Sequence, residues 1–193
     1  MKKIINEDSS TQKESIKLSK GLGLIFKMIT ELPQITVSAV EGPAMAGAFG
    51  IVCSTDLVLS MSSARFAMTE TRIGLSPAQI APYVIDRLGF SNARKLILLG
   101  FSIDGNQAYN MGLTDYLSKT KEEFNETLNS IKRQVNQCAP RALTLTKNII
   151  RPRNEIDIDL SAKIFAECIE SEEGKEGIKS FFEKKKPYWA VRS

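Results

Sequence analysis

Apolar positions recur along the chain with two different periods, and the change of period separates expected helices from expected strands. Over residues 13–32 the apolar positions return at helical spacing and Pro33 follows directly, so the pattern predicts one helix there. The segment "QITVSAV" at 34–40 is rich in β-branched residues and predicts a buried strand. Residues 1–12 are polar and are expected to form a poorly ordered tail.

Beyond this strand the pattern alternates between short strands and short helices. Pro77 is expected in the first turn of one helix, which Gly89 should end, and Ser91 and Gly100 should bound the next. The elements expected are a helix at 45–54, strands at 57–62 and 64–68, helices at 76–89, 91–100 and 103–112, and a strand at 113–118.

After residue 119 every segment has helical periodicity. The expected helices lie at 121–137, 140–151, 158–171 and 173–185. The chain therefore divides into an α/β core over 13–118 and a helical region over 119–193. With 193 residues this is one domain, or a domain with a helical appendage.

The amino-acid composition argues against several classes of protein. The chain is 42% hydrophobic and 25% charged, as in an ordinary soluble globular protein. The net charge of +4 and an aromatic content of 7% give little support to an RNA-binding module. Three separated cysteines fit a reducing, cytoplasmic setting rather than a disulfide framework or a zinc site. The N-terminus lacks the apolar stretch of a signal peptide, and no apolar run is long enough to span a membrane, so no membrane contact is expected.

The stretch "EGPAMAGAFGIVCSTD" at 41–56 follows the first predicted strand and contains three glycines. A strand that passes through glycines into a helix presents unpaired N–H groups, and glycine lets a ligand approach them closely. The phosphate-binding patterns GxxxxGK[ST] and GxGxxG are absent from it. Two interpretations remain, a backbone donor for an oxyanion or a tight contact between helix and strand.

Glu70 stands between the predicted strand at 64–68 and a Gly-Leu-Ser-Pro turn. The chain contains no histidine, so acid–base chemistry would fall to Asp, Glu, Lys, Tyr or Cys. Glu70 is therefore one candidate for a general acid or base. The alternative is a solvated glutamate paired with Arg72.

These motifs, taken in order, resemble the enoyl-CoA hydratase/isomerase family, the crotonase superfamily. In that family a strand leads into N/D-G-x-A-x-G-G-G, a buried helix, C-D-x-x-x-A, A-x-F-x-x-x-E and a G-x-x-P turn. Gly47 falls at the middle glycine, Asp56 at the aspartate, and "ARFAMTE" ends on Glu70 at the glutamate. Segments 90–117 and 172–189 are similar to later motifs of the family.

The resemblance implies a crotonase-like spiral α/β core with a helical C-terminal trimerisation region, and a homotrimer or hexamer. It implies an enzyme that holds the enolate of an acyl-CoA thioester in an oxyanion hole, with coenzyme A as part of the substrate and no other cofactor or metal. Gly47 would supply a backbone donor and Glu70 would be the acid/base. The hydratases carry a further glutamate three residues after the middle glycine, where this chain has Gly50.

Gly50, Glu70 and "GLSPAQIAPYV" together are similar to the branch that contains methylglutaconyl-CoA and isohexenylglutaconyl-CoA hydratases. The residues that the resemblance places around the acyl group are Ala46, Pro77, Ala78 and Ile80. Plain helix initiation is the alternative for Pro77 and Ala78. Lys184 and Lys186 could meet the phosphates of coenzyme A, although a solvated basic helix end would also explain them.

Family members carry several dozen residues ahead of the matched part, with opening strands and an A-G-x-D-[LI] segment that supplies the other oxyanion donor. Nothing before Lys13 resembles that segment, so the N-terminal strands are expected to be missing. Two hypotheses follow. The chain is an enoyl-CoA hydratase or isomerase with one acidic residue in its site, or it is a truncated, catalytically inactive paralogue that keeps the fold and its oligomerisation.

Overall fold

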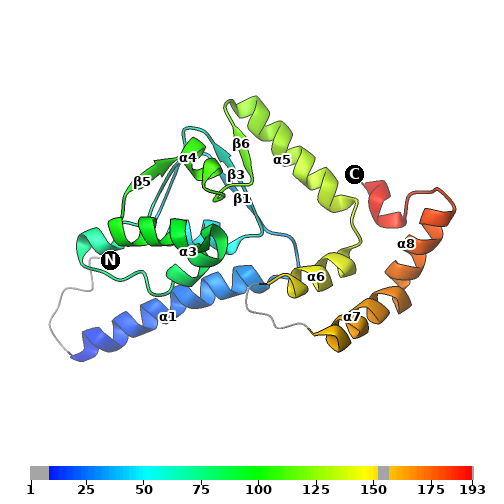
Figure 1. Ribbon diagram of the computed structural model, residues 1–193, viewed down its shortest axis with the longest axis horizontal. Coiled ribbons are helices and arrows are strands. Elements are labelled where there is room, and N and C mark those ends of the chain that lie inside the picture. The colour runs from blue at the N-terminus through cyan, green and yellow to red at the C-terminus, as the bar shows by residue number, and fades with distance from the viewer. Residues whose placement is uncertain (1–8, 152–156, 193) are drawn as a thin grey trace.

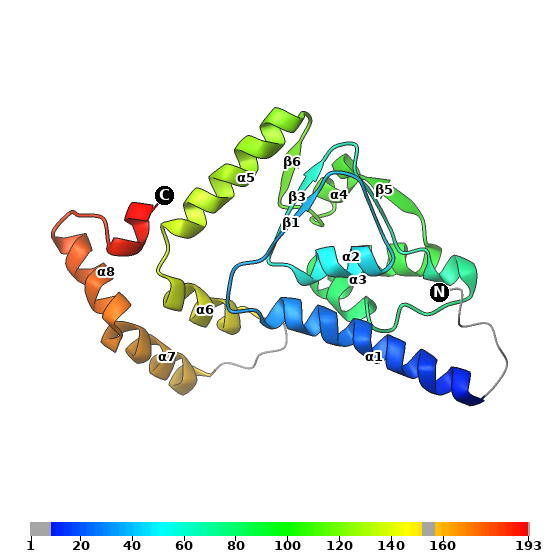
Figure 2. The same ribbon diagram turned by 180° about the vertical axis from the view of Figure 1, so that it is seen from behind.

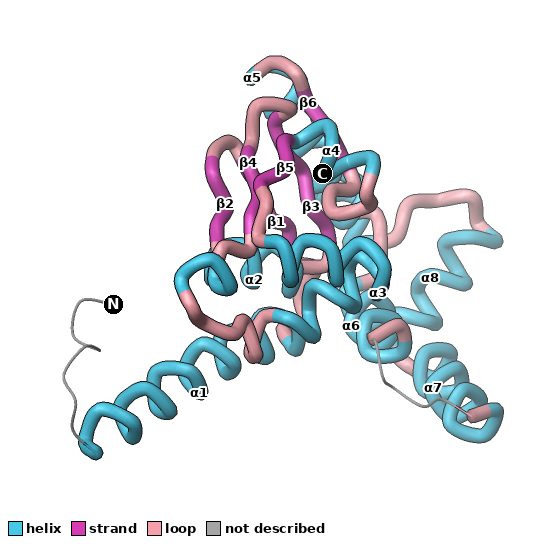
Figure 3. The backbone as a smooth tube through the Cα atoms, turned by 60° about the vertical axis from the view of Figure 1, so that its left-hand side comes forward, coloured by secondary structure: helices cyan, strands magenta, loops and turns pink. Residues whose placement is uncertain are grey.

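The computed structural model describes residues 9–151 and 157–192. Within this part of the chain there are two three-stranded sheets, and α1 (Ser9–Glu31), α2 (Gly47–Ser54) and α3 (Ala81–Leu99) lie on one side of them (Figures 1 and 3). The strands are β1 (Val37–Val40), β2 (Pro43–Met45), β3 (Leu57–Met61), β4 (Arg65–Ala67), β5 (Ser102–Asp104) and β6 (Tyr116–Ser118).

The two sheets differ in their pairing. The first has the order β1-β3-β6 and is entirely parallel, with Leu59 of the central strand opposite Ala39 on one side and Tyr116 on the other. The second has the order β2-β4-β5, in which β2 and β4 are parallel and β5 is antiparallel. In the parallel pair Met45 lies opposite Ala67.

Helices cover both sheets and continue beyond them. They are α1 (Ser9–Glu31), α2 (Gly47–Ser54), α3 (Ala81–Leu99), α4 (Gly105–Asn110), α5 (Lys121–Asn136), α6 (Pro140–Ile149), α7 (Ile158–Glu170) and α8 (Glu172–Phe182), with short 3₁₀ turns η1 (Glu70–Ile73) and η2 (Tyr188–Arg192). The long helix α1 runs along the base of the domain and packs against α2 (Figure 2).

The core lies on two faces of the central strand β3. Val58 packs into the main core with α1, α2 and α3, whereas its neighbour Leu59 packs with Phe124 and Ile131 of α5. This alternation follows from the strand geometry, because successive side chains point to opposite faces. The first sheet therefore contacts the main core on one side and α5 on the other.

Helices α6, α7 and α8 form an arm that extends away from the sheets (Figures 1 and 2). The arm exposes large aromatic side chains, among them Phe165, Phe181 and Phe182. Within residues 9–151 and 157–192, no helix combines the length and the apolar character needed to cross a membrane.

The expected α/β core with a helical C-terminal part is confirmed, but several boundaries differ. The first helix begins at Ser9, so residues 9–12 are helical rather than part of a tail, whereas residues 1–8 lie outside the described residues. The placement of Pro77 in the first turn of a helix is wrong. Its carbonyl accepts hydrogen bonds from Ile80 N and Ala81 N in a preceding turn, and the helix begins at Ala81.

The predicted helix break at Gly89 is confirmed: α3 consists of two helical segments that meet at a kink, where Gly89 has the non-helical angles φ 68° and ψ 161°. A positive φ is the conformation expected of a glycine that ends a helix. At Gly89 the next helical segment follows at once, so the glycine produces a kink in α3. Strands β2 and β5 were not predicted. Each has three residues, too few to show a period of two.

Candidate active site

Gly47 is the first residue of α2 and follows the end of β2 directly after Ala46. Side chains cap the N-termini of α4 and α5, where Asp104 and Thr120 accept hydrogen bonds from backbone N–H groups. Within the described part of the chain, α2 has no such cap. The first N–H groups of a helix have no acceptor within it, so those of α2 are left available to a ligand.

The backbone at Ala46 shapes this turn. Ala46 has φ 50° and ψ −119°, a conformation that L-residues rarely adopt, and its N–H donates to Ala67 O at 3.0 Å. At Gly47 an added β-carbon would meet no atom beyond its chain neighbours within 4 Å. The space in front of the Gly47 backbone is therefore open to a ligand.

Glu70 begins the 3₁₀ turn that follows β4, and it is 9% exposed. Its Oε2 atom is buried and has no hydrogen-bond partner among the described residues. The alternative of a solvated glutamate is therefore wrong, and Arg72 donates its Nε–H to Leu99 O at 3.3 Å. A buried carboxylate oxygen without a partner is uncommon in folded proteins and is the kind of group that a bound ligand satisfies.

The parallel pairing of β2 and β4 brings these two features to the same edge of the second sheet. Met45 lies opposite Ala67, Gly47 follows Met45 by two residues, and Glu70 follows Ala67 by three. The carboxyl ends of parallel strands meet at one edge, where ligand sites of α/β proteins commonly form. A backbone donor and a buried carboxylate thus both follow the carboxyl ends of neighbouring parallel strands.

The next turn of α2 is closed by apolar side chains. A β-carbon at Gly50 would lie 2.7 Å from Cζ of Phe26 and 3.2 Å from Cγ2 of Ile80. Phe26 is fully buried and stacks edge-to-face on Tyr83, with ring centroids 5.5 Å apart. The ring of Phe26 therefore occupies the space that a side chain at position 50 would need.

Sequence reasoning did not identify Phe26 as a neighbour of this site. Its only signal was an apolar position in the 13–32 helix, which many core residues share. Its role becomes visible only because α1 packs across α2.

The residues predicted around an acyl group lie in different surroundings. Ala46 adjoins Gly47, and Ile80 is buried against Gly50. Pro77 is buried in the turn before α3, whereas Ala78 in the same turn is exposed. Contact of these four residues with a substrate stays a prediction.

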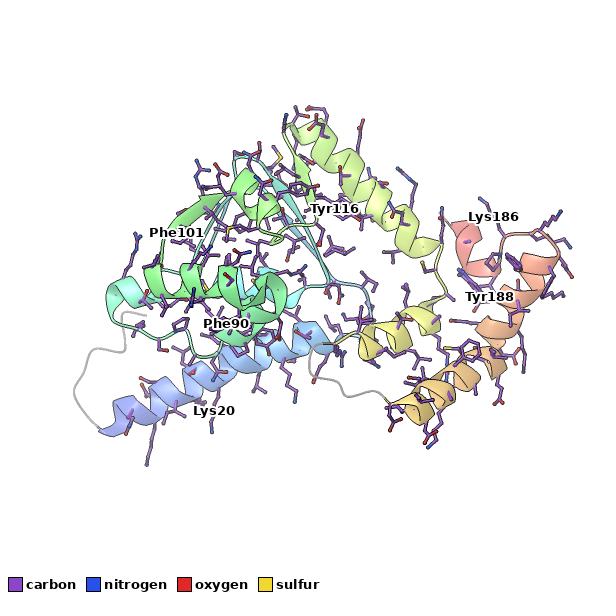
Figure 4. The ribbon with its side chains drawn as sticks, in the orientation of Figure 1. Lys20, Phe90, Phe101, Tyr116, Lys186 and Tyr188 are labelled. Carbon is purple, nitrogen blue, oxygen red and sulfur yellow. The ribbon has the colours of Figure 1, made fainter. Side chains whose placement is uncertain are left out.

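The structure does not bring Lys184 and Lys186 to this edge. Both follow α8, which contacts α6 and α7, and Lys186 lies on the distal side of the C-terminal arm (Figure 4). The basic run therefore stands beyond the end of the helix, in a turn where Lys184 has a positive φ of 54°. A role for these lysines in binding coenzyme A stays a prediction.

A cavity of about 630 Å³ opens at the other end of α2, where Cys53 and Ser54 contribute to its wall. Burial raises the pKa of the Cys53 thiol to about 12, although Arg87 opposes the shift. This end of α2 carries the partial negative charge of the helix, which is unfavourable for an oxyanion. We therefore place the candidate site at Gly47 and Glu70, not in this cavity.

A buried ion pair also borders that cavity. Lys147 Nζ donates to Asp56 Oδ2 at 2.7 Å and to Gln34 O at 2.9 Å, and the Lys147 side chain is 4% exposed. Asp56 Oδ2 also accepts from Thr36 N and Thr36 Oγ1 at 2.6 and 2.7 Å. Among the described residues, no group of three or more His, Cys, Asp or Glu side chains is arranged to hold a metal ion.

Comparison with known proteins gives consistent results. A family model described as enoyl-CoA hydratase/isomerase matches residues 1–192. The crystal structure of an enoyl-CoA hydratase/isomerase from Marinobacter aquaeolei has a TM-score of 0.85 and 36% identity, and covers 90% of this chain and 67% of that one. Pseudomonas aeruginosa AtuE has a TM-score of 0.88 and 32% identity, with coverage of 95% and 71%. The short-chain-enoyl-CoA hydratase of Clostridium acetobutylicum is 29% identical over 167 residues, which are 84% of this chain and 64% of that protein.

Proposed function

Because the chain belongs to the enoyl-CoA hydratase/isomerase family, we propose that it transfers protons on an acyl-CoA thioester through an enolate. In this proposal the N–H of Gly47 donates to the thioester oxygen, and Glu70 is the single acid/base. The observation that carries it is the buried, unpartnered Oε2 of Glu70 at the same sheet edge as the open N-terminus of α2.

The chemistry proposed for hydration uses one carboxylate twice. Glu70 takes a proton from water as the water oxygen bonds to Cβ of a conjugated thioester, and the electrons of the double bond move to the thioester oxygen. The Gly47 N–H stabilises the resulting enolate, since a fixed amide donor is worth most where negative charge develops. Glu70 then returns the proton to Cα. In an isomerisation the same carboxylate would take a proton from one carbon and return it to another.

The test compares Glu70→Gln with Glu122→Gln, an exposed glutamate on α5 that serves as the matched control. Crotonyl-CoA and methylglutaconyl-CoA are supplied, and loss of the conjugated-thioester absorbance is followed. We expect turnover by the unaltered chain and by Glu122→Gln, and a fall of about 10²–10⁴-fold in Glu70→Gln. Full activity in Glu70→Gln would remove Glu70 from its assigned role.

Binding is tested separately from turnover. Gly47→Leu places a side chain in open space, so the melting temperature should stay unchanged. The affinity for the thioester, measured by calorimetry, should fall by about tenfold or more. If the unaltered chain neither binds nor converts a thioester, the result supports the hypothesis of an inactive paralogue and contradicts the hypothesis of an enzyme. Binding without turnover would support the proposed contact between Gly47 and the thioester oxygen and would contradict the proposed catalytic activity.

We also propose that the C-terminal arm mediates a homotrimer or hexamer. Phe181 and Phe182 are 79% and 76% exposed, and large exposed aromatic side chains favour burial in a protein interface. Sedimentation of Phe181→Glu/Phe182→Glu beside the unaltered chain tests this. Loss of the larger species supports the proposal, and an unchanged mass contradicts it.

A further inference from the structure

Helix α1 carries two apolar stripes, and the core uses one of them. Phe26 lies on the inner stripe, fully buried against α2. The second stripe consists of Leu18, Gly21, Ile25 and Met28, and it continues to Leu32, the first residue after α1; the side chains of Leu18, Ile25, Met28 and Leu32 are between 42% and 66% exposed. Figure 4 shows α1 at the edge of the molecule, with Lys20 extending away from the sheets. We call these five residues the outer seam.

The spacing of the outer seam is that of a helix packed against another helix. Leu18, Ile25 and Leu32 repeat every seven residues, and Gly21 and Met28 fall three residues after the first two. Alternating steps of three and four place all five on one stripe, which is the pattern of a two-helix seam. The tertiary core of this chain does not explain the repeat, because the seam faces outward.

Two charged residues flank the seam at equivalent positions. Lys17 lies seven residues before Leu24 and Glu31 lies seven after it, so both stand on the same side of the stripe at opposite ends. In a parallel, in-register pair Lys17 and Glu31 stay 14 residues apart along the helices, so these opposite charges cannot meet. In an antiparallel pair each lysine meets the glutamate of the other helix, and two favourable contacts form.

We propose that the outer seam binds the outer seam of a second copy of this chain, antiparallel and about a two-fold axis near Leu24. Each contact is then made twice, as in any two-fold interface. Glu31 is available for this pairing, because its contact with Lys27 is an exposed ion pair at 3.8 Å, which contributes little to stability. None of the five seam residues belongs to the C-terminal arm or to the candidate active site.

Cysteine cross-linking tests the geometry. In a Cys138→Ser/Cys168→Ser background, Leu24→Cys puts a thiol beside its own symmetry mate, whereas in Met28→Cys the two thiols are offset by roughly 12 Å along the helix axis. We expect oxidation to cross-link Leu24→Cys into a dimer and to leave Met28→Cys monomeric on a denaturing gel. Cross-linking of Met28→Cys indicates a parallel pair and overturns the proposal, as does no cross-link in either variant.

Charge reversal tests the pairing in solution. Lys17→Glu and Glu31→Lys each turn two attractions into repulsions, so sedimentation should show association weakened about fivefold to tenfold. The double variant Lys17→Glu/Glu31→Lys restores opposite charges in the antiparallel pair, and its association should return to that of the unaltered chain. Weakening that is additive in the double variant refutes the proposal. All variants are measured with Phe181→Glu/Phe182→Glu present, so that contacts of the arm do not mask the result.

Discussion

Lys147 is the clearest place to test how the C-terminal helices are held to the α/β core. Its ammonium group comes from α6 and reaches Asp56, which follows α2, and Gln34, which precedes β1. With 4% of its side chain exposed, the charge has little contact with water. Lys147→Met removes the charge and keeps most of the side-chain volume.

The expected loss of stability in Lys147→Met depends on the interactions that Asp56 keeps. Removing one partner of a buried ion pair costs about 3–5 kcal/mol, because the other charge is left without compensation. Here Asp56 keeps both hydrogen bonds from Thr36, and a quarter of its side chain is exposed. The expected loss in the free energy of unfolding is therefore at the lower end, about 3 kcal/mol. Asp56→Asn should lose a similar amount, and the double variant should lose less than the sum.

Urea denaturation followed by circular dichroism measures these losses, at one protein concentration because association shifts apparent stability. The matched control is Lys121→Met, which breaks an ion pair with Glu41 whose two side chains are about half exposed. It should cost no more than about 1 kcal/mol. A loss below about 1 kcal/mol in Lys147→Met, or additive losses in the double variant, would refute the assignment of a buried, coupled pair.

Three further predictions concern single backbone or side-chain positions. Ala46→Gly should raise the free energy of unfolding by about 0.5–1 kcal/mol in urea titration, because glycine relieves the unfavourable φ of 50°; a loss of stability would contradict the strain. Gly105→Ala should lower it by more than about 2 kcal/mol, since its β-carbon would lie 2.1 Å from Met61 O. Cys53 should resist alkylation in the native protein at pH 8 while the exposed Cys138 reacts, as mass spectrometry of the labelled peptides can show. Since the folded pKa of Cys53 is raised from 9.0 to about 12, the stability that this thiol contributes should be present below pH 9 and fall as the pH rises toward 12. Cys53→Ala should remove that part of the pH dependence, and an unchanged slope would contradict the assignment.

Local patterns in the sequence located most of the elements. The helical period of 13–32 and the β-branched run at 34–40 reflect which side chains face the core, so they can be read without the fold. The same is true of Gly47 and Glu70, which ordered motifs singled out. Strands β2 and β5 were not predicted because three residues carry no period. The placement of Pro77 in the first turn of the helix was wrong because either of two nearby prolines, Pro77 or Pro82, could open the helix.

The tertiary structure decided which of these residues meet. Gly47 and Glu70 are 23 positions apart, and only the parallel register of β2 on β4 brings both to one edge of a sheet. Phe26 gained its place against Gly50 from the crossing of α1 over α2, a contact that no local pattern encodes. The sequence by itself determined most of the helical and extended segments, because propensity and periodicity are local, and the order of its motifs singled out Gly47 and Glu70 as candidates. Burial, the unpartnered oxygen of Glu70 and the separation of the lysines after α8 from the site depend on long-range packing, which only the folded chain defines.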